Sequence, residues 1–238
     1  MIGGGSNAGL GELTRPLRLA HRGDWRRAPE NSMAALLAAT AVAGCDGVEF
    51  DVRIARDGVP VVIHDPTLDR VQGVDGRVDA ADASALAAHA VPTLADVLVA
   101  LPPRAFLDVE LKAHDHGAVT ASVLRSTRGH APSRAVVSSF EPTTLAAMRD
   151  LLPGWPRWLN ADDLEPETLW VAAELGCAAV SARHDAIDAG AVLRARRAGL
   201  AVAAWTVRTL EDEGRLDALG VVAVCVEDDA LDPGGAGA

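Results

Sequence analysis

The sequence lacks two features that would each indicate a particular class of protein. Its three cysteines, Cys45, Cys177 and Cys225, lie far apart in apolar surroundings without a Cys-x-x-Cys pair, which argues against zinc and redox motifs and predicts buried free thiols. Its longest apolar run, residues 34–44, is too short to cross a bilayer, and residues 1–16 contain no apolar signal-peptide core. We therefore expect a cytoplasmic protein without an integral membrane segment.

Positive charge is also scarce. The formal net charge is -11 and the isoelectric point is near 5.0. This balance removes the electrostatic attraction that a general binder of nucleic acid or anionic membranes needs. We expect a small-molecule substrate and no nucleic acid, and a phosphate substrate would need local cations.

The chain alternates short Val/Ala/Leu-rich runs with longer helical stretches, which is the pattern of βα units around a parallel sheet. Strand-like runs lie at residues 17–21, 47–52, 105–110, 135–139, 157–160, 178–182, 201–206 and 221–226. Helix candidates lie at residues 32–44, 92–101, 141–152, 165–176, 188–199 and 210–220. The economical interpretation is an α/β fold, a (β/α)8 TIM barrel, although a doubly wound sheet shares much of the pattern. One barrel domain over residues 17–232 is predicted, with flexible segments at 1–16 and 233–238.

One apparent strand, residues 59–65, does not fit the parallel count. Only Asp57 and Gly58 separate it from the preceding run, whereas parallel neighbours need a crossover of a dozen or more residues. Asp-Gly between apolar runs is a hairpin signal, so we expect a β-hairpin extension after the second strand. With Asp57 and Gly58 as a two-residue loop, His64 would lie directly opposite Asp51.

Strand periodicity gathers charged side chains on one face of two strands. Glu49 and Asp51 point the same way, and so do Asp108, Glu110 and Lys112. Barrel enzymes build their sites at the C-terminal ends of such strands. Converging carboxylates without a thiolate suit a hard cation, Mg²⁺ or Ca²⁺, better than zinc. The sequence therefore predicts Glu49, Asp51 and Glu110 as metal ligands.

The same charges also fit two arrangements that contain no metal site. The charged residues could lie on the exposed face of antiparallel strands, although the opposite faces of both runs are strongly apolar. Alternatively, Lys112 and Arg22 could neutralise the carboxylates in an ion-pair network without any metal.

Several motifs occur in an order that is more specific than any one of them. They are HRG at 21–23, PENS at 29–32, GVEFDV at 47–52, DGVPVVIHD at 57–65, VPTLADVL at 91–98 and DVELK at 108–112, followed more loosely by SSF at 138–140 and AWTV at 204–207. This series resembles the glycerophosphodiester phosphodiesterase family.

The resemblance implies a hydrolase of lipid metabolism that cleaves glycerophosphodiesters to glycerol-3-phosphate and an alcohol. It implies His21 and His64 as the acid/base pair, a divalent cation held by Glu49, Asp51 and Glu110, phosphate contacts from Arg22 and Lys112, and Trp205 in the substrate cleft. Elementary chemistry agrees, because a cation with Arg and Lys can offset the growing charge of a phosphodiester transition state. One histidine must take a proton from the nucleophile while the other gives one to the leaving alkoxide.

Flanking residues have supporting roles in this interpretation. We expect Asn31 or Ser32 to cap the following helix and Glu30 to hold Arg22. His114 and His116 are expected in a solvated loop. Near the C-terminus, residues 224–232 depart from the family, which usually has a Thr-Asp pair at this strand end, so Glu227 or Asp228 is the candidate to replace that Asp.

Two hypotheses from other classes of protein are kept. A sugar-phosphate aldolase-type barrel would use Lys112 as a Schiff-base nucleophile. A non-catalytic phosphate-binding barrel would bind glycerophosphodiesters without turnover.

Overall fold

The computed structural model describes residues 14–112 and 117–232 of the chain. Its strands are β1 (Leu17–His21), β2 (Gly47–Ile54), β3 (Pro60–Val62), β4 (Phe106–Leu111), β5 (Ala135–Ser139), β6 (Arg157–Ala161), β7 (Ala179–Arg183), β8 (Ala201–Val207) and β9 (Ala223–Val226). Its α-helices are α1 (Met33–Ala39), α2 (Asp69–Gln72), α3 (Ala83–Ala87), α4 (Leu94–Ala100), α5 (Gly117–Arg128), α6 (Pro142–Leu151), α7 (Pro166–Glu174), α8 (Ala189–Arg197), α9 (Leu210–Leu219) and α10 (Asp228–Leu231). Two short 3₁₀ helices are η1 (Val78–Ala80) and η2 (His184–Ala186).

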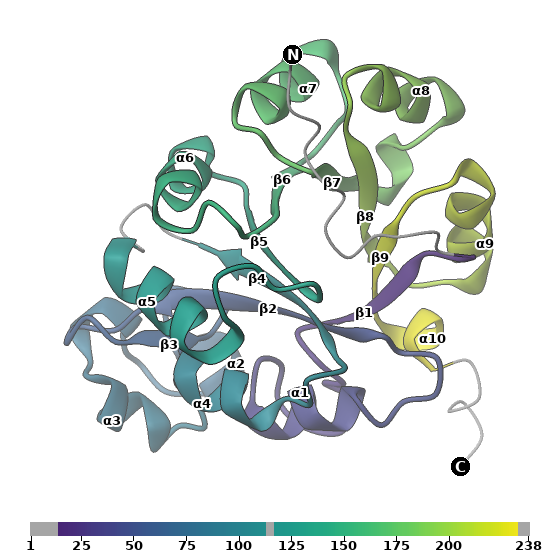
Figure 1. Cartoon of the computed structure of the whole chain (residues 1–238). Helices are drawn as coiled ribbons and strands as arrows, with labels where there is room; N and C mark the ends of the chain where they lie inside the picture. The colour runs from purple at the N-terminus through teal and green to yellow at the C-terminus, as the bar shows by residue number, and fades with distance from the viewer. Residues whose placement is uncertain (1–13, 113–116, 233–238) are drawn as a thin grey trace.

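Eight parallel strands form a closed barrel in the part of the chain that the structure describes. Each of β1, β2 and β4 to β9 pairs with its neighbour, and β1 closes the ring by pairing with both β2 and β9. In Figure 1 the purple β1 lies beside the yellow-green β9, and helices surround the strands. The predicted (β/α)8 TIM barrel is confirmed, and the doubly wound alternative is wrong because such a sheet stays open.

Several of the helices begin where the sequence supplies a capping side chain. Ser32, Thr93 and Thr209 each accept a hydrogen bond from a backbone N–H in the first turn of α1, α4 and α9. Gly220, with a φ of 73°, ends α9 in the left-handed conformation that glycine adopts most easily. These signals account for the starts of α1, α4 and α9, each of which lies within a predicted helix range.

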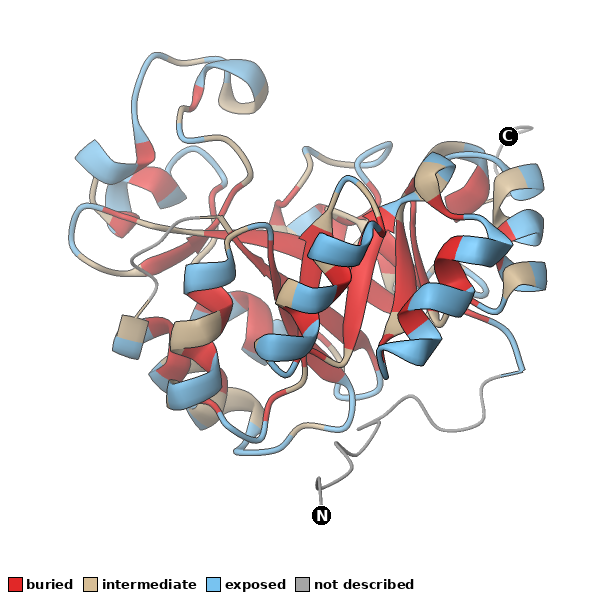
Figure 2. Ribbon diagram, turned by 90° about the horizontal axis from the view of Figure 1, so that it is seen from above, coloured by how far each residue is buried: buried red, intermediate tan, exposed pale blue. Residues whose placement is uncertain are grey.

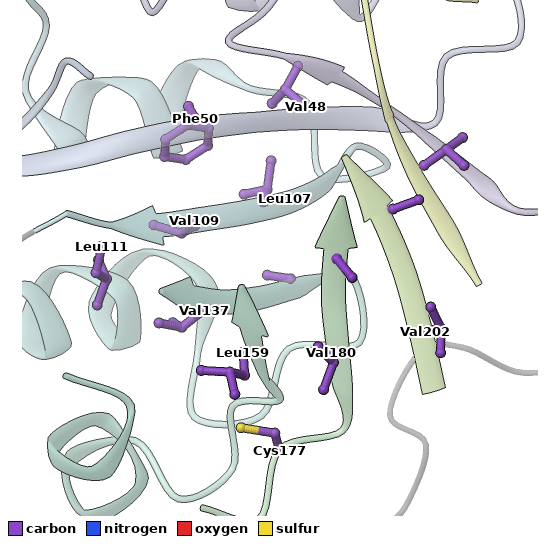
Figure 3. Packing of buried hydrophobic residues seen from close by; sticks show 14 of the residues in the cluster. Val48, Phe50, Leu107, Val109, Leu111, Val137, Leu159, Cys177, Val180 and Val202 are labelled. Atoms are coloured by element: carbon purple, nitrogen blue, oxygen red, sulfur yellow. The ribbon is translucent and has the colours of Figure 1, made fainter. Parts of the chain in front are cut away.

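The strands bury apolar side chains on both faces, because alternate residues point inward and outward. Between the strands and the helices, the packed residues include Val48, Phe50, Leu107, Val109 and Val137 (Figure 3). A second layer fills the N-terminal end of the barrel interior with Leu17, Leu19, Phe106, Val136, Trp158, Ala179, Ala203 and Ala223. Figure 2 shows buried strands and helices whose outer faces are exposed. Asp108, Ser138, Asn160 and Ser181 are buried and each follows a member of this layer by two residues, so the next layer toward the C-terminal end of the barrel is polar.

The extension after β2 is an antiparallel hairpin, as predicted, but its loop is longer than predicted. The Ala55 N–H donates to the Val59 carbonyl at 2.9 Å, so residues 56–58 form a three-residue loop. Gly58 has a φ of 80°, the left-handed position that ends such a loop. Glycine thus occupies the third loop position, and the prediction of a two-residue loop is wrong.

The longer loop shifts the hairpin register by one residue. The Asp51 carbonyl accepts a hydrogen bond from the Ile63 N–H at 2.9 Å, so the prediction that His64 lies directly opposite Asp51 is wrong. Because β3 ends at Val62, strand alternation does not set the direction of the His64 side chain. Arg53 Nε donates to the His64 carbonyl at 2.6 Å and fixes the backbone there.

The hairpin and the segment after it have a small core of their own, which we call the hairpin cluster. It consists of the buried residues Ala55, Val61, Ile63, Leu68, Val78, Ala83, Leu86 and Val91. The extension beside the barrel is therefore packed around buried apolar side chains of its own.

The structure also bears on the expectations about the cysteines and about membrane-spanning segments. All three cysteines are free thiols, with Cys177 and Cys225 buried and Cys45 only half-buried. Within residues 14–112 and 117–232, we find no helix of the length and apolarity required to span a membrane.

Candidate active site

A cavity of about 260 Å³ opens at the C-terminal end of the barrel, the end where barrel enzymes place their sites. Seven of the eight predicted site residues line it, namely His21, Arg22, Glu49, His64, Glu110, Lys112 and Trp205. The eighth, Asp51, is 1% exposed and belongs to the carboxylate cluster beside the cavity. The barrel therefore brings together residues that are separated by up to 184 positions in the sequence, from His21 to Trp205.

A larger cavity of about 320 Å³ lies at the opposite end of the barrel, where Gly47 begins β2 and Ala105 precedes β4. Its only carboxylate among the lining residues, Asp46, is already paired with Arg15 at 2.6 Å. None of the predicted site residues lies there, so its size does not make it the better candidate.

Three carboxylates converge as predicted. One oxygen from each of Glu49, Asp51 and Glu110 lies within 4.8 Å of the other two. Parallel pairing of β2 with β4 explains this, because Asp51 is aligned with Glu110 and Glu49 with Asp108. All three carboxylates are buried.

The buried carboxylates differ in their pKa values. Burial, together with the charges of Asp51 and Glu110, raises the pKa of Glu49 well above its usual range. Burial and Asp51 raise the pKa of Glu110 to about 7. Burial also disfavours the charge on Asp51, but Lys112 and Arg22 outweigh it and hold the pKa of Asp51 at about 2. Burial is the largest influence on all three carboxyl groups, and the two neighbouring cations outweigh it only at Asp51.

Two cations lie against the carboxylates. Lys112 Nζ is 3.0 Å from an Asp51 oxygen and also forms an ion pair with Glu110. Arg22 Nε is 3.3 Å from the other Asp51 oxygen, and the Arg22 backbone N–H donates to Glu49 at 3.1 Å. Part of the ion-pair network that the sequence also allowed is therefore present.

The donor set nevertheless fits a hard divalent cation. Glu49 Oε1 is buried and has neither a hydrogen-bond nor an ion-pair partner among the described residues. A buried carboxylate oxygen without a partner is costly unless a cation occupies the space it faces. Since all three candidate ligands offer carboxylate oxygens, Mg²⁺ or Ca²⁺ matches this chemistry.

Both histidines are hydrogen-bonded to carboxylates through the same ring nitrogen. His21 Nδ1 lies 2.7 Å from Glu227 Oε2, and His64 Nδ1 lies 2.6 Å from Asp65 Oδ1. Such a partner fixes the ring orientation and leaves Nε2 to exchange a proton. Burial is the largest influence on His64 and lowers its pKa, although Asp51 opposes the shift.

The loop between β1 and α1 holds two site residues, Asp51 and Arg22, in place. Ser32 caps α1, whereas Asn31 Nδ2 donates to Asp51 at 2.7 Å and Asn31 Oδ1 accepts from the Asp51 N–H at 3.2 Å. Glu30 accepts from Arg22 at 2.9 Å, as expected. Asn31 thus orients a candidate metal ligand.

An aromatic wall completes one side of the cavity. The Trp205 ring meets the Phe140 ring edge-on with centroids 5.4 Å apart, and Trp205 Nε1 donates to the Ser181 carbonyl at 2.9 Å. Lys112 Nζ lies 5.8 Å from the Phe140 centroid. The wall provides an apolar surface for carbon atoms of a substrate.

Sequence reasoning missed several contributors. Asp65 and Asp108 are carboxylates within the predicted motifs that had no predicted role; Asp108 accepts from Ser138 at 2.6 Å, and burial raises its pKa to about 7. The arginines that bind the histidine partners, Arg70 and Arg208, were also missed. Asp65 follows His64 directly, and that adjacency was the available signal. His114 and His116 lie outside the described residues.

The sequence profile of the glycerophosphoryl diester phosphodiesterase family matches residues 21–230 of this chain. The match begins at His21 and extends past Glu227, so it spans every residue of the cavity described above. Fold and site together define a barrel hydrolase of phosphoric diesters. The chain belongs to the glycerophosphoryl diester phosphodiesterase family.

Individual relatives agree with this assignment. A glycerophosphodiester phosphodiesterase of Caldanaerobacter subterraneus is 26% identical over 231 residues, covering 90% of this chain and 95% of the relative. Among solved structures, an Oleispira antarctica phosphodiesterase in complex with the product sn-glycerol-3-phosphate is 26% identical, with a TM-score of 0.80 over 89% of this chain and 93% of that one. The Agrobacterium tumefaciens glycerophosphodiester phosphodiesterase is also 26% identical, with a TM-score of 0.76 over 91% and 98% of the two chains.

Proposed function

We propose that this protein hydrolyses glycerophosphodiesters to glycerol-3-phosphate and an alcohol, using a divalent cation and two histidines. The observation that carries the proposal is the pairing of two carboxylate-bound histidines with a buried three-carboxylate cluster around one cavity. Glu49, Asp51 and Glu110 would hold Mg²⁺ or Ca²⁺. A bound cation would act as a Lewis acid that offsets phosphoryl charge.

The chain's own residues supply the rest of the chemistry. Arg22 and Lys112 line the cavity and place positive charge beside a bound phosphodiester. Glu227 and Asp65 hold Nδ1 of the two histidines, so that one Nε2 can accept a proton from the nucleophile and the other can donate one to the leaving alkoxide. Trp205 would pack on the carbon skeleton of the substrate.

The two alternative functions are less well supported. Burial alone would lower the pKa of Lys112, but Asp51 and Glu110 raise it above its usual value, so the amine stays protonated and is a poor Schiff-base nucleophile. An idle phosphate-binding barrel has no need for two histidines oriented by carboxylates.

A product assay tests the proposal. The protein is incubated with glycerophosphocholine or glycerophosphoethanolamine, with and without added Mg²⁺ or Ca²⁺, and glycerol-3-phosphate is measured enzymatically. We expect glycerol-3-phosphate and the free alcohol in equal amounts. Borohydride-trapped Lys112 adducts, or binding of these diesters without turnover, would favour one of the alternatives instead.

A further inference from the structure

We propose that Arg70 is a positioning residue that couples the orientation of His64 to the orientation of Arg22. The inference rests on the proposed function, because it concerns two residues of the same site. Arg70 does not line the cavity, and its side chain is 48% exposed, so it acts through other residues. We call the group formed by Arg70, Asp65 and Glu30 the arginine bridge.

Arg70 binds two carboxylates at once. Its two terminal nitrogens donate to the two oxygens of Glu30 at 3.0 and 2.6 Å, and its Nε donates to Asp65. A planar guanidinium has donors on two edges, so one arginine can hold two carboxylates in fixed directions. A lysine would offer a single point charge in the same place.

Each carboxylate of the bridge contacts a different part of the site. Asp65 binds Nδ1 of His64 at 2.6 Å, and Glu30 binds a terminal nitrogen of Arg22 at 2.9 Å. A continuous series of hydrogen bonds therefore joins a proposed acid/base group to a proposed phosphate-binding group. Among the described residues, Arg70 is the second side chain that binds each carboxylate, so its loss would leave Asp65 held by His64 and Glu30 held by Arg22, each with fewer constraints on its direction.

The position of Arg70 is itself well defined. Arg70 lies in α2, and Leu68, the residue directly before this helix, is 4% exposed and packs in the hairpin cluster. The Leu68 N–H also donates to the Gly76 carbonyl at 3.0 Å. The arginine bridge thus connects the segment that follows β3 to two residues of the cavity.

Stability alone does not explain the bridge, because an ion pair near the protein surface contributes little to folding. The same extension contains a comparable pair, in which Arg77 donates through Nε and a terminal nitrogen to Asp79 at 2.9 and 2.6 Å. That pair is exposed and contacts no site residue, so it is a matched control for Arg70.

The test compares the kinetics of Arg70→Met with those of Arg77→Met on glycerophosphocholine. Releasing a group that orients a functional side chain typically costs about 10- to 100-fold. We expect Arg70→Met to lower kcat/KM by about this factor, with both a lower kcat and a higher KM. Arg77→Met should match the wild type, and Arg70→Lys should recover only part of the loss.

Double mutants separate positioning from a general structural effect. When Asp65 is already replaced by Asn, adding Arg70→Met should lower kcat by at most about 3-fold. When Glu30 is already replaced by Gln, adding Arg70→Met should raise KM by at most about 3-fold. Full additivity in both backgrounds would overturn the proposal. Circular dichroism checks folding, and Arg70→Lys replaces Arg70→Met if the latter does not fold.

The outcomes also separate this inference from the function on which it rests. If the wild type releases no glycerol-3-phosphate with either metal, the proposed function fails. If the wild type is active and Arg70→Met equals Arg77→Met, only the role of Arg70 is contradicted.

Discussion

His21 Nδ1 lies 2.7 Å from Oε2 of Glu227, a residue 206 positions later in the chain. Pairing of β1 with β9 brings the two together, since His21 ends β1 and Glu227 directly follows β9. Burial would raise the pKa of Glu227, but His21 and Arg208 outweigh it and hold the value below its usual range. Glu227 therefore stays ionised and orients His21.

This relationship predicts a large effect for Glu227→Gln. The amide cannot stabilise a protonated imidazole, so kcat on glycerophosphocholine should fall by roughly 10- to 1,000-fold, within the range of acid/base catalysis. The matched control is Asp228→Asn, because Asp228 is the next residue and contacts Arg208 at 3.8 Å but has no contact with His21. Equal activity of both variants would contradict the role of Glu227.

The sequence shows that the end of the last strand lacks the Thr-Asp pair usual in the family. It does not show whether Glu227 or Asp228 takes the place of that Asp. A carboxylate is visible in the sequence, whereas its contact depends on the register between the first and last strands. The carboxylate cluster was easier to predict, because strand alternation alone puts Glu49 and Asp51 on one face.

The register of the hairpin between β2 and β3 could not be predicted from the sequence. Asp57-Gly58 indicates a turn, and the antiparallel pairing follows from it. Glycine can take the left-handed conformation in either a two-residue or a three-residue loop, so the dipeptide does not fix the register. The orientation of His64 depends instead on where β3 ends and on the Arg53 contact with its backbone.

A second prediction asks which histidine is the acid. His21→Ala and His64→Ala should each lower the rate on glycerophosphocholine by about 10² to 10⁴. An alkoxide needs a proton as it leaves, whereas p-nitrophenolate does not. On glycerophospho-p-nitrophenol, only the variant that lacks the acid should recover most of its rate. Near-normal rates of both variants on glycerophosphocholine would rule out the two-histidine mechanism.

A third prediction concerns Gly47, which begins the strand that carries two candidate ligands. A Cβ there would lie 1.9 Å from the Phe106 carbonyl oxygen, so Gly47→Ala must push β2 away from β4. We expect a loss of about 1–3 kcal/mol or more in the free energy of unfolding, measured by urea denaturation. In Gly214→Ala the new methyl group meets no atom within 4 Å, and this helix substitution should be stabilising. Equal stability of the two variants would contradict the close approach.

A fourth prediction concerns acid stability. Burial would raise the pKa of Asp65, but hydrogen bonds from Arg70 and His64 outweigh it and lower the value to about 2. Because this is below the unfolded value of about 3.9, ionised Asp65 stabilises the folded state above pH 4. This stabilisation disappears as the pH falls toward 2. The stability advantage of the wild type over Asp65→Asn should therefore shrink between pH 5 and pH 3, and a constant difference would contradict the lowered pKa.

A fifth prediction concerns metal affinity. Glu49→Gln removes one carboxylate charge with little change in volume, so the barrel should stay folded. Affinity for Mg²⁺ or Ca²⁺, measured by titration calorimetry, should fall by at least the roughly 10- to 100-fold that loss of an outer partner costs. Asp46→Asn, at the opposite end of the barrel, is the control and should bind the metal like the wild type. Unchanged affinity of Glu49→Gln would exclude that residue as a ligand.

The most direct test of the metal-dependent mechanism is the rate of glycerol-3-phosphate release by exhaustively chelated protein, before and after adding Mg²⁺ or Ca²⁺. The proposal rests on oxygen ligands from Glu49, Asp51 and Glu110, so chelation should abolish the activity and one of these ions should restore it. Full activity of a preparation that elemental analysis finds free of metal would contradict it.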